Sequence, residues 1–351
     1  MNHHPFQPAR IIQAVFRCRS FLAAFAVFGL ALSALGQVNY VRELTGTEGF
    51  TSLLQMTQAP YETSRPDYST MPSKPYLVTR SHYYTIDPSN GGVLPLAGVQ
   101  FPPTVKLGIG SLVALSGQNT ASPLLHLVTS QNTILTFKIT TGQPITQTPL
   151  LDATVYSSMA ARSRDAQLLS LIADNQHFTA NPITGELISV PLADVKMSEA
   201  FYQSYGQDGL LYVLDYANDR IASFDPDNAF APVGGFSLST SVTTANVQFA
   251  IGPTGSFYLA DGLGGGSYYD STGAFHGAFS LPGGTVGDPY TGASYVSTDS
   301  VGSVYIFDSA TGFHQFQDVA VSAVPEPGAT LTGMALICLA AASRRRRQSL
   351  E

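Results

Sequence analysis

Residues 208–226 read Asp-Gly-Leu-Leu-Tyr-Val-Leu-Asp-Tyr-Ala-Asn-Asp-Arg-Ile-Ala-Ser-Phe-Asp-Pro. The apolar run at 211–213 alternates across a predicted strand, so that both faces of the strand can pack against neighbours. Asp-Gly and Asp-Pro at the two ends favour turns. We expect Asp215 and Arg220 to pair across the loop between the two strands, as structural rather than catalytic residues.

The same unit, a strand pattern followed by a polar loop and a second strand pattern ending in a turn, recurs along the chain. Further copies occupy 76–88, 125–142, 169–185, 255–273 and 302–312. One aliphatic residue near the end of each first strand marks the copies: Val78, Val128, Ile172, Val213, Leu259 and Ile306. The intervals of 50, 44, 41, 46 and 47 residues between these markers are typical of β-propeller blades.

The repeats predict an all-β protein, a β-propeller of six blades over residues 67–322. Residues 37–66 form an N-terminal segment that could close the ring, and a seventh blade could come from 40–66. A two-sheet β-sandwich with six or seven strand pairs is the alternative.

Residues 211–225 resemble an NHL-type propeller repeat, in the pattern Leu-Tyr-Val-x-Asp-x-x-Asn-x-Arg-Ile followed by Phe and Asp. The Asp-Gly spacing that precedes the pattern is two residues shorter here, at Asp208 and Gly209. The other copies lack the Asn-x-Arg part. The resemblance implies a propeller in which Asp215 and Arg220 are structural.

The composition excludes several classes of protein. Only 12% of the 351 residues are charged, and the chain has 32 Gly and 22 Pro, which argues against a helical bundle, a coiled coil or an acidic disordered chain. Seventeen Lys and Arg stand against 24 Asp and Glu, so we expect no nucleic-acid partner.

The first 36 residues have the pattern of a secretory signal peptide: arginines, an apolar stretch of about a dozen residues, and small residues before the cleavage point. Ala34 and Gly36 at positions −3 and −1 predict cleavage by signal peptidase before Gln37. An uncleaved N-terminal anchor is the alternative.

Residues 324–347 have three parts in order. These are the triplet Pro325, Glu326 and Pro327, an uncharged stretch over 328–343 that predicts a short transmembrane helix, and the arginines Arg344, Arg345, Arg346 and Arg347. Arginines after an apolar run favour retention of that flank in the cytoplasm. The stretch is short for the roughly 20 residues of a spanning helix, although arginine side chains can snorkel. An ordinary single-pass tail anchor would share these features.

This tail resembles the PEP-CTERM sorting signal of Gram-negative bacteria. The resemblance implies transient anchoring in the inner membrane, processing near the triplet by an exosortase, and delivery to the outer envelope or the extracellular polysaccharide. It leaves the function of the rest of the chain open. Between the two ends, residues 37–327 hold 10 basic and 23 acidic side chains, a net charge of about −13, and no cysteine.

No motif of high chemical specificity occurs in the sequence, and the histidines are scattered. His126 lies in an apolar strand pattern, which favours a buried, hydrogen-bonded histidine over a metal ligand. We expect His177 in a solvated loop, with a pocket beside Asp174 as the alternative. The glycines at 262–266 lack the Lys and the helix of a phosphate-binding loop, so they predict an inter-strand loop.

Four aspartates, each two residues after the marker of its repeat, form the candidate site: Asp174, Asp215, Asp261 and Asp308. In a closed ring they would recur on four successive blades. Such an arc could bind Ca²⁺, which takes six to eight oxygen ligands. Turn-forming side chains on one rim are the alternative, and the sequence predicts no other cofactor.

Two functions follow from these features. The first is an exported, non-catalytic propeller that binds a polysaccharide or a protein in the envelope or the extracellular matrix. The second is a propeller hydrolase or lyase that acts on a carbohydrate or a lactone, with a metal or carboxylates in the central channel.

Overall fold

The computed structural model describes part of the chain. The described residues are 38–44, 53–58, 75–79, 82–86, 93–101, 112–116, 124–129, 132–139, 141–150, 156–162, 168–197, 200–239, 247–260, 265–281, 295–299, 302–308 and 312–318.

The described elements are strands and two 3₁₀ turns. The strands are β1 (Val38–Glu43), β2 (Leu53–Gln58), β3 (Pro75–Thr79), β4 (His82–Ile86), β5 (Val93–Gln100), β6 (Leu112–Ser116), β7 (Leu124–Val128), β8 (Thr133–Lys138), β9 (Pro144–Pro149), β10 (Tyr156–Ala161), β11 (Leu169–Ala173), β12 (Gln176–Ala180), β13 (Leu187–Ser189), β14 (Ala200–Tyr205), β15 (Leu211–Asp215), β16 (Arg220–Asp225), β17 (Ala231–Ser237), β18 (Gln248–Ile251), β19 (Phe257–Ala260), β20 (Gly265–Tyr269), β21 (Phe275–Ser280), β22 (Tyr295–Thr298), β23 (Ser303–Asp308) and β24 (Gly312–Asp318). The 3₁₀ turns are η3 (Tyr216–Asn218) and η4 (Pro226–Asn228).

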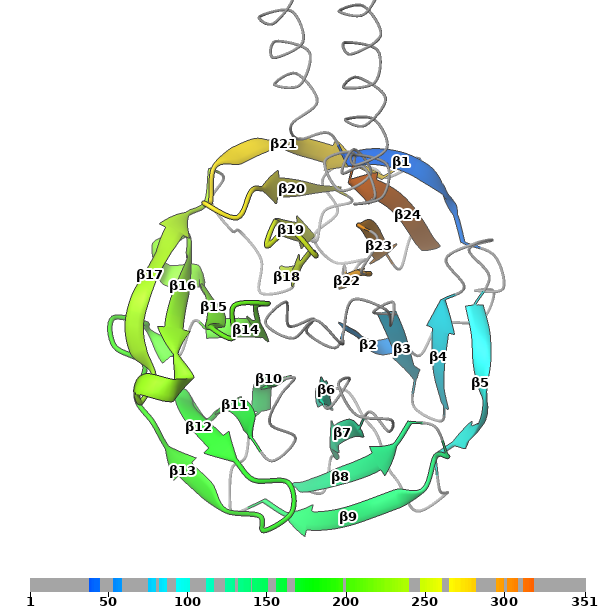
Figure 1. The fold of residues 1–351 in the computed structure, drawn as a ribbon, viewed down its shortest axis with the longest axis vertical. Helices are drawn as coiled ribbons and strands as arrows, with labels where there is room; N and C mark the ends of the chain where they lie inside the picture. The colour runs from blue at the N-terminus through cyan, green and yellow to red at the C-terminus, as the bar shows by residue number, and fades with distance from the viewer. Residues whose placement is uncertain are drawn as a thin grey trace, which may run out of the picture.

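Within the described residues the strands form six antiparallel four-stranded sheets. Sheets 1 to 5 are β2–β5, β6–β9, β10–β13, β14–β17 and β18–β21, and sheet 6 has the order β22-β23-β24-β1. The first strands of neighbouring sheets contact one another in the cycle β2, β6, β10, β14, β18, β22 and back to β2. Figure 1 shows the resulting ring. The fold is therefore an all-β β-propeller, and the β-sandwich alternative is wrong.

Sheet 6 joins the two ends of the repeat region. Its outermost strand, β1, comes from the start of the described chain and pairs antiparallel with β24 near the end. Leu44, just after β1, donates its backbone N–H to the carbonyl of Phe313 at 2.8 Å. The ring is closed by this pairing of distant segments.

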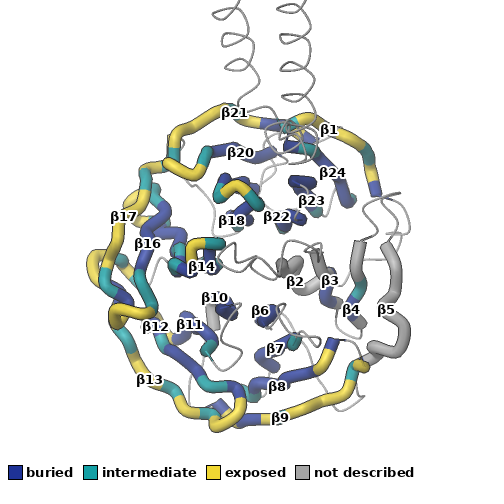
Figure 2. The backbone as a smooth tube through the Cα atoms, in the orientation of Figure 1, coloured by how far each residue is buried: buried dark blue, intermediate teal, exposed yellow. Residues whose placement is uncertain are grey.

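The core lies between the sheets rather than around one centre. Apolar residues of the second and third strands, such as Leu171, Val213 and Phe224, are at most 1% exposed. The outer strands β9, β13, β17 and β21 are mostly exposed (Figure 2). Each sheet is too small to bury its own faces, so it packs them against its neighbours in the ring.

The repeat markers prove to lie on the second strand of each sheet, not on its first. Val78 is on β3 and Ile306 on β23, for example. The sequence unit therefore consists of the second and third strands, which are the most apolar. Sheet 1 begins at Leu53, within the segment 37–66.

Both terminal signals, 1–36 and 324–347, lie outside the described residues. Within the described part of the chain, no helix is long and apolar enough to span a membrane.

Candidate functional site

Sheets 4, 5 and 6 share one turn between their first two strands. Gly209, Gly255 and Gly302 occupy the same place in it, with φ of 81°, 79° and 81°. This left-handed conformation is strained for residues with a Cβ atom. Two residues after each glycine, the second strand has an apolar residue, which is followed by a tyrosine: Tyr212, Tyr258 or Tyr305. In sheet 6 this stretch, residues 299–308, reads Asp-x-x-Gly-x-Val-Tyr-Ile-x-Asp.

Each of the three equivalent tyrosines donates its hydroxyl to a carboxylate, but the carboxylate comes from a different place each time. Tyr212 donates to Asp208 Oδ2 at 2.7 Å within its own turn. Tyr305 donates to Asp299 Oδ2 at 2.9 Å, also within its own turn. Burial raises the pKa of both phenols, and the neighbouring carboxylates raise it further.

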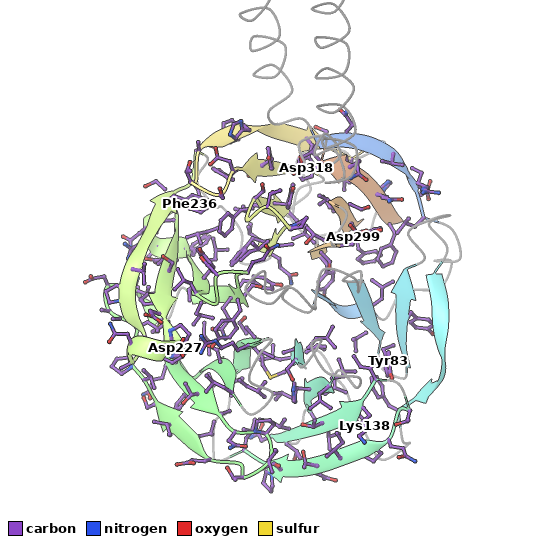
Figure 3. The ribbon with its side chains drawn as sticks, in the orientation of Figure 1. Tyr83, Lys138, Asp227, Phe236, Asp299 and Asp318 are labelled. Atoms are coloured by element: carbon purple, nitrogen blue, oxygen red, sulfur yellow. The ribbon has the colours of Figure 1, made fainter. Side chains whose placement is uncertain are left out.

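Tyr258 instead donates across a boundary between two sheets, to Asp318 Oδ2 at the end of β24. Both residues are fully buried, and burial together with the charge of Asp318 raises the pKa of the phenol. Figure 3 labels Asp318 and Asp299 in sheet 6. Another contact links sheets 3 and 4, where Arg162 donates from Nη1 and Nη2 to the two carboxylate oxygens of Asp227, both at 2.6 Å.

We expect Asp318→Ala to lower the free energy of unfolding by about 2–4 kcal/mol, because it leaves the buried Tyr258 hydroxyl without this acceptor and opens a small cavity. Denaturant titration measures the change. Asp208→Ala is the matched control, since it removes the partner of the half-buried Tyr212 at an exposed position, and we expect a cost below about 1 kcal/mol. Equal losses of unfolding free energy in the two variants would show that the buried Tyr258–Asp318 pair stabilises the fold no more than the exposed Tyr212–Asp208 pair.

A pocket of about 380 Å³ lies between sheets 4 and 5. Sheet 4 contributes the β14–β15 turn and the ring of Tyr212, and sheet 5 contributes the β18–β19 turn, Phe257 and Ser271. The rings of Tyr212 and Phe257 meet edge to face, with centroids 5.0 Å apart. Gln207 donates from Nε2 to the Gly252 carbonyl at 2.8 Å, which holds the two turns together.

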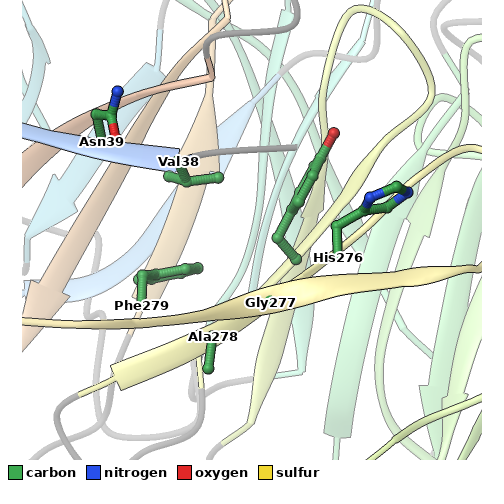
Figure 4. Close-up of a pocket in the computed structure, with 7 residues that line it drawn as sticks. Val38, Asn39, His276, Gly277, Ala278 and Phe279 are labelled. Atoms are coloured by element: carbon green, nitrogen blue, oxygen red, sulfur yellow. The ribbon is translucent and has the colours of Figure 1, made fainter. Parts of the chain in front are cut away.

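A second pocket, of about 300 Å³, lies on the outer rim between β21 and β1 (Figure 4). His276 Nε2 is 2.8 Å from Asp270 Oδ2 beside it, and both side chains are partly exposed. Partial burial alone would raise the pKa of Asp270. Hydrogen bonds from Thr272, His276 and the backbone N–H groups of Thr272 and Ala274 outweigh burial and hold this pKa well below its usual range.

The structure describes three of the four predicted aspartates, with Asp174 in sheet 3, Asp215 in sheet 4 and Asp308 in sheet 6. Asp215 is fully buried at the end of β15, where its Oδ2 accepts from Arg220 Nε and Asn218 Nδ2, both at 2.8 Å. The predicted Asp215–Arg220 pair is thus confirmed. Asp174 lies in the tight turn between β11 and β12 with φ of 46°.

Asp308 ends β23, and Asp261 lies outside the described residues. In the described part of the chain no group of three or more His, Cys, Asp or Glu side chains is arranged to hold a metal ion. Calcium binding by this set remains a prediction from the sequence.

His126 and His177 both lie in the core. His126 is fully buried, with Nε2 2.6 Å from Ser116 Oγ and Nδ1 3.0 Å from Thr136 Oγ1, as predicted. The solvated loop predicted for His177 is wrong. His177 lies on β12 and is 1% exposed. Its ring contacts Ser170 Oγ at 2.6 Å and the Val190 carbonyl at 2.9 Å, which satisfy both ring nitrogens in the core.

The Ser116–His126 and Ser170–His177 pairs have the spacing of a nucleophile and its base. All four residues are at most 1% exposed, so a substrate cannot reach them. Gln203 closes the second cluster, since its Oε1 lies 2.7 Å from Ser170 Oγ and its Nε2 donates to the Ser158 and Ser170 carbonyls. The His126 cluster joins three strands of sheet 2, and the His177 cluster joins sheets 3 and 4, which indicates a structural role for both.

Sequence reasoning missed the pocket between sheets 4 and 5. Its residues do not form a motif, because they come from turns some 45 to 65 residues apart. The signal that could have found it is the alignment of the turns, with Gly209, Gly255 and Gly302 in register.

Neither a family model nor a curated protein matches this sequence. Two solved structures are similar at low identity. Virginiamycin B lyase from Staphylococcus aureus is 10% identical, with a TM-score of 0.49, and the match covers 80% of this chain and 99% of the other. BBS1N, crystallised in complex with ARL6DN, is 12% identical, with a TM-score of 0.44 and coverage of 78% and 80%.

Proposed function

We propose that this chain is exported and that its propeller is a non-catalytic binding module of the outer envelope or the extracellular matrix. The six sheets are then the complete set of blades, with residues 38–44 closing the ring rather than starting a seventh blade. The ligand is a polysaccharide or a protein.

One observation carries the binding role. The groups with the chemistry of a catalyst, the Ser–His pairs and Asp215, are buried in contacts within and between sheets. The two pockets described above are instead lined by aromatic rings and short polar groups, and the one between sheets 4 and 5 adds the carboxylate of Asp208. Such surfaces suit recognition of a ligand.

The export part of the proposal is supported by the two ends of the sequence. The segment 1–36 fits a signal peptide, and 324–347 fits a PEP-CTERM signal read by an exosortase. The inner membrane would then be a transient anchor through the helix predicted at 328–343.

We expect the secreted protein to begin at Gln37 and to end near Pro327 when it is produced in a Gram-negative host that has an exosortase. Mass spectrometry of both termini measures this. A matched host without the enzyme should retain the tail, because the arginines at 344–347 hold it in the membrane. A variant with alanine at 325–327 should lose C-terminal processing at least tenfold. The same C-terminus in both hosts would contradict exosortase processing.

A further inference from the structure

The pocket between sheets 4 and 5 has an equivalent position at the boundary of sheets 5 and 6. There the two sheets are joined by the hydrogen bond from Tyr258 to Asp318. In sheet 6, Tyr305 pairs with Gln315 across the second and third strands, so Asp318 comes three residues after the tyrosine's partner. In sheet 5, Tyr258 pairs with Tyr268, and the residue at the same place is Ser271. Ser271 is therefore the structural equivalent of Asp318.

The difference between serine at 271 and aspartate at 318 explains why the pocket is open at one boundary and filled at the other. At the boundary of sheets 5 and 6, the carboxylate of Asp318 reaches the tyrosine of the preceding sheet and fills the space. At the boundary of sheets 4 and 5, the shorter Ser271 lines a pocket of about 380 Å³, and Tyr212 donates within its own turn instead. The Arg162–Asp227 contact closes the boundary of sheets 3 and 4. The pocket thus lies between two closed boundaries.

The pocket is pre-organised. Asp208 accepts the backbone N–H of Leu210 on Oδ1 at 3.1 Å and the Tyr212 hydroxyl on Oδ2 at 2.7 Å, so its exposed carboxylate is fixed in place. Gly206 is required for this arrangement. A Cβ atom there would lie 2.5 Å from Asp208 Oδ1 and 2.6 Å from Cε2 of Tyr212.

The lining combines an apolar wall with short polar groups. Tyr212 and Phe257 supply the aromatic wall, Thr254 and Ser271 supply hydroxyls, and Asp208 supplies the single carboxylate. A carboxylate with free lone pairs accepts hydrogen bonds from hydroxyl groups, and hydroxyl groups both donate and accept hydrogen bonds. The net negative charge of the domain disfavours anionic ligands. A neutral, hydroxyl-rich ring of about hexose size fits this combination.

We propose that the pocket between sheets 4 and 5 is a saccharide subsite that takes one neutral sugar residue, with Asp208 accepting hydrogen bonds from sugar hydroxyls and the Tyr212–Phe257 wall packing against the ring. This assignment rests on the binding role proposed above and names its ligand class. A single sugar in an open pocket binds weakly, with a dissociation constant on the order of millimolar.

The test is saturation-transfer NMR on the full-length protein with glucose, galactose, mannose and N-acetylglucosamine. We expect at least one of them to bind, and Ser271→Asp to weaken that binding at least tenfold, because it fills the pocket as Asp318 fills its equivalent. Ser280→Asp, which adds the same charge at an exposed site on β21, should bind as the wild type does. Asp208→Asn should weaken binding at least threefold.

Melting temperatures separate loss of the site from loss of the fold, since Ser271→Asp should melt no lower than Ser280→Asp. Two results would overturn the assignment: no binding of any of the four sugars, whether or not methylammonium binds, or binding that survives Ser271→Asp. Each leaves the termini of the secreted protein, and with them the export part of the proposed function, unaffected.

Discussion

Lowering the pH from 7 to 4 should cost the folded protein about 3 kcal/mol of stability for each of His126 and His177. Burial lowers the pKa of His126 to about 3. Burial also lowers the pKa of His177, to about 4, because the hydrogen bond to the Val190 carbonyl offsets only part of the effect. The ordinary value of about 6.5 applies to both in the unfolded chain.

The sign follows from proton binding. Above pH 6.5 both histidines are neutral in the folded and in the unfolded chain, so their contribution to stability is fully present. Between pH 6.5 and about 4 the unfolded chain takes up protons that the folded core excludes, so stability falls by about 1.4 kcal/mol per pH unit for each histidine. Because typical domains are stable by only 5–15 kcal/mol, this loss brings the propeller close to unfolding.

Urea titrations at pH 7, 6, 5 and 4 measure the slope of stability against pH. His126→Gln should reduce the slope by about 1.4 kcal/mol per pH unit, whatever its effect on stability at pH 7. An imidazole NMR titration of His126 centred near pH 6.5 would refute the explanation.

The architecture was predictable because its signal is repeated. The second strands are apolar in every sheet, as at Leu171 and Val213, and their spacing of 41 to 50 residues reports the repeat even where the sequences diverge. The first and fourth strands gave no such signal. The fourth strands β9, β13, β17 and β21 are largely exposed, for example at Val233 (57%), so little constrains their sequence beyond the backbone ladder.

The candidate sites were predictable only in part. The Asp215–Arg220 pair was found because its residues are five apart and register across a hairpin. His177 was predicted to be solvated because its polar neighbours in the sequence form a turn. Its hydrogen-bond partners lie elsewhere, Ser170 on β11 and Val190 just after β13. The proposed sugar pocket depends on the shorter side chain of Ser271 at the place where sheet 6 has the carboxylate of Asp318. Such a difference becomes visible only once the strand registers align the sheets.

Removing residues 1–44 should abolish cooperative folding, the largest effect expected of any change considered. β1 supplies the only partner of the outer edge of β24 in the described sheet, through the ladder from Val38 with Asp318 to Glu43 with His314. Leu44, 2% exposed, packs with Tyr305 and Phe313 in the core beneath. Without these residues the ring is open, and an apolar face and a strand edge are exposed to solvent and to aggregation.

Circular dichroism melting and size-exclusion chromatography measure the loss, against a chain that starts at Gln37. Leu44→Ala should cost about 2–4 kcal/mol, because it leaves a cavity in this core. Val41→Ala should cost less than about 1 kcal/mol, since Val41 lies on the same strand but is 44% exposed. A synthetic peptide of residues 37–46 added in trans should restore part of the folded signal of the truncated chain, because closure depends on strand pairing and not on chain connectivity. Cooperative melting of the truncated chain at the temperature of the Gln37 chain would show instead that the sheets hold the ring without β1.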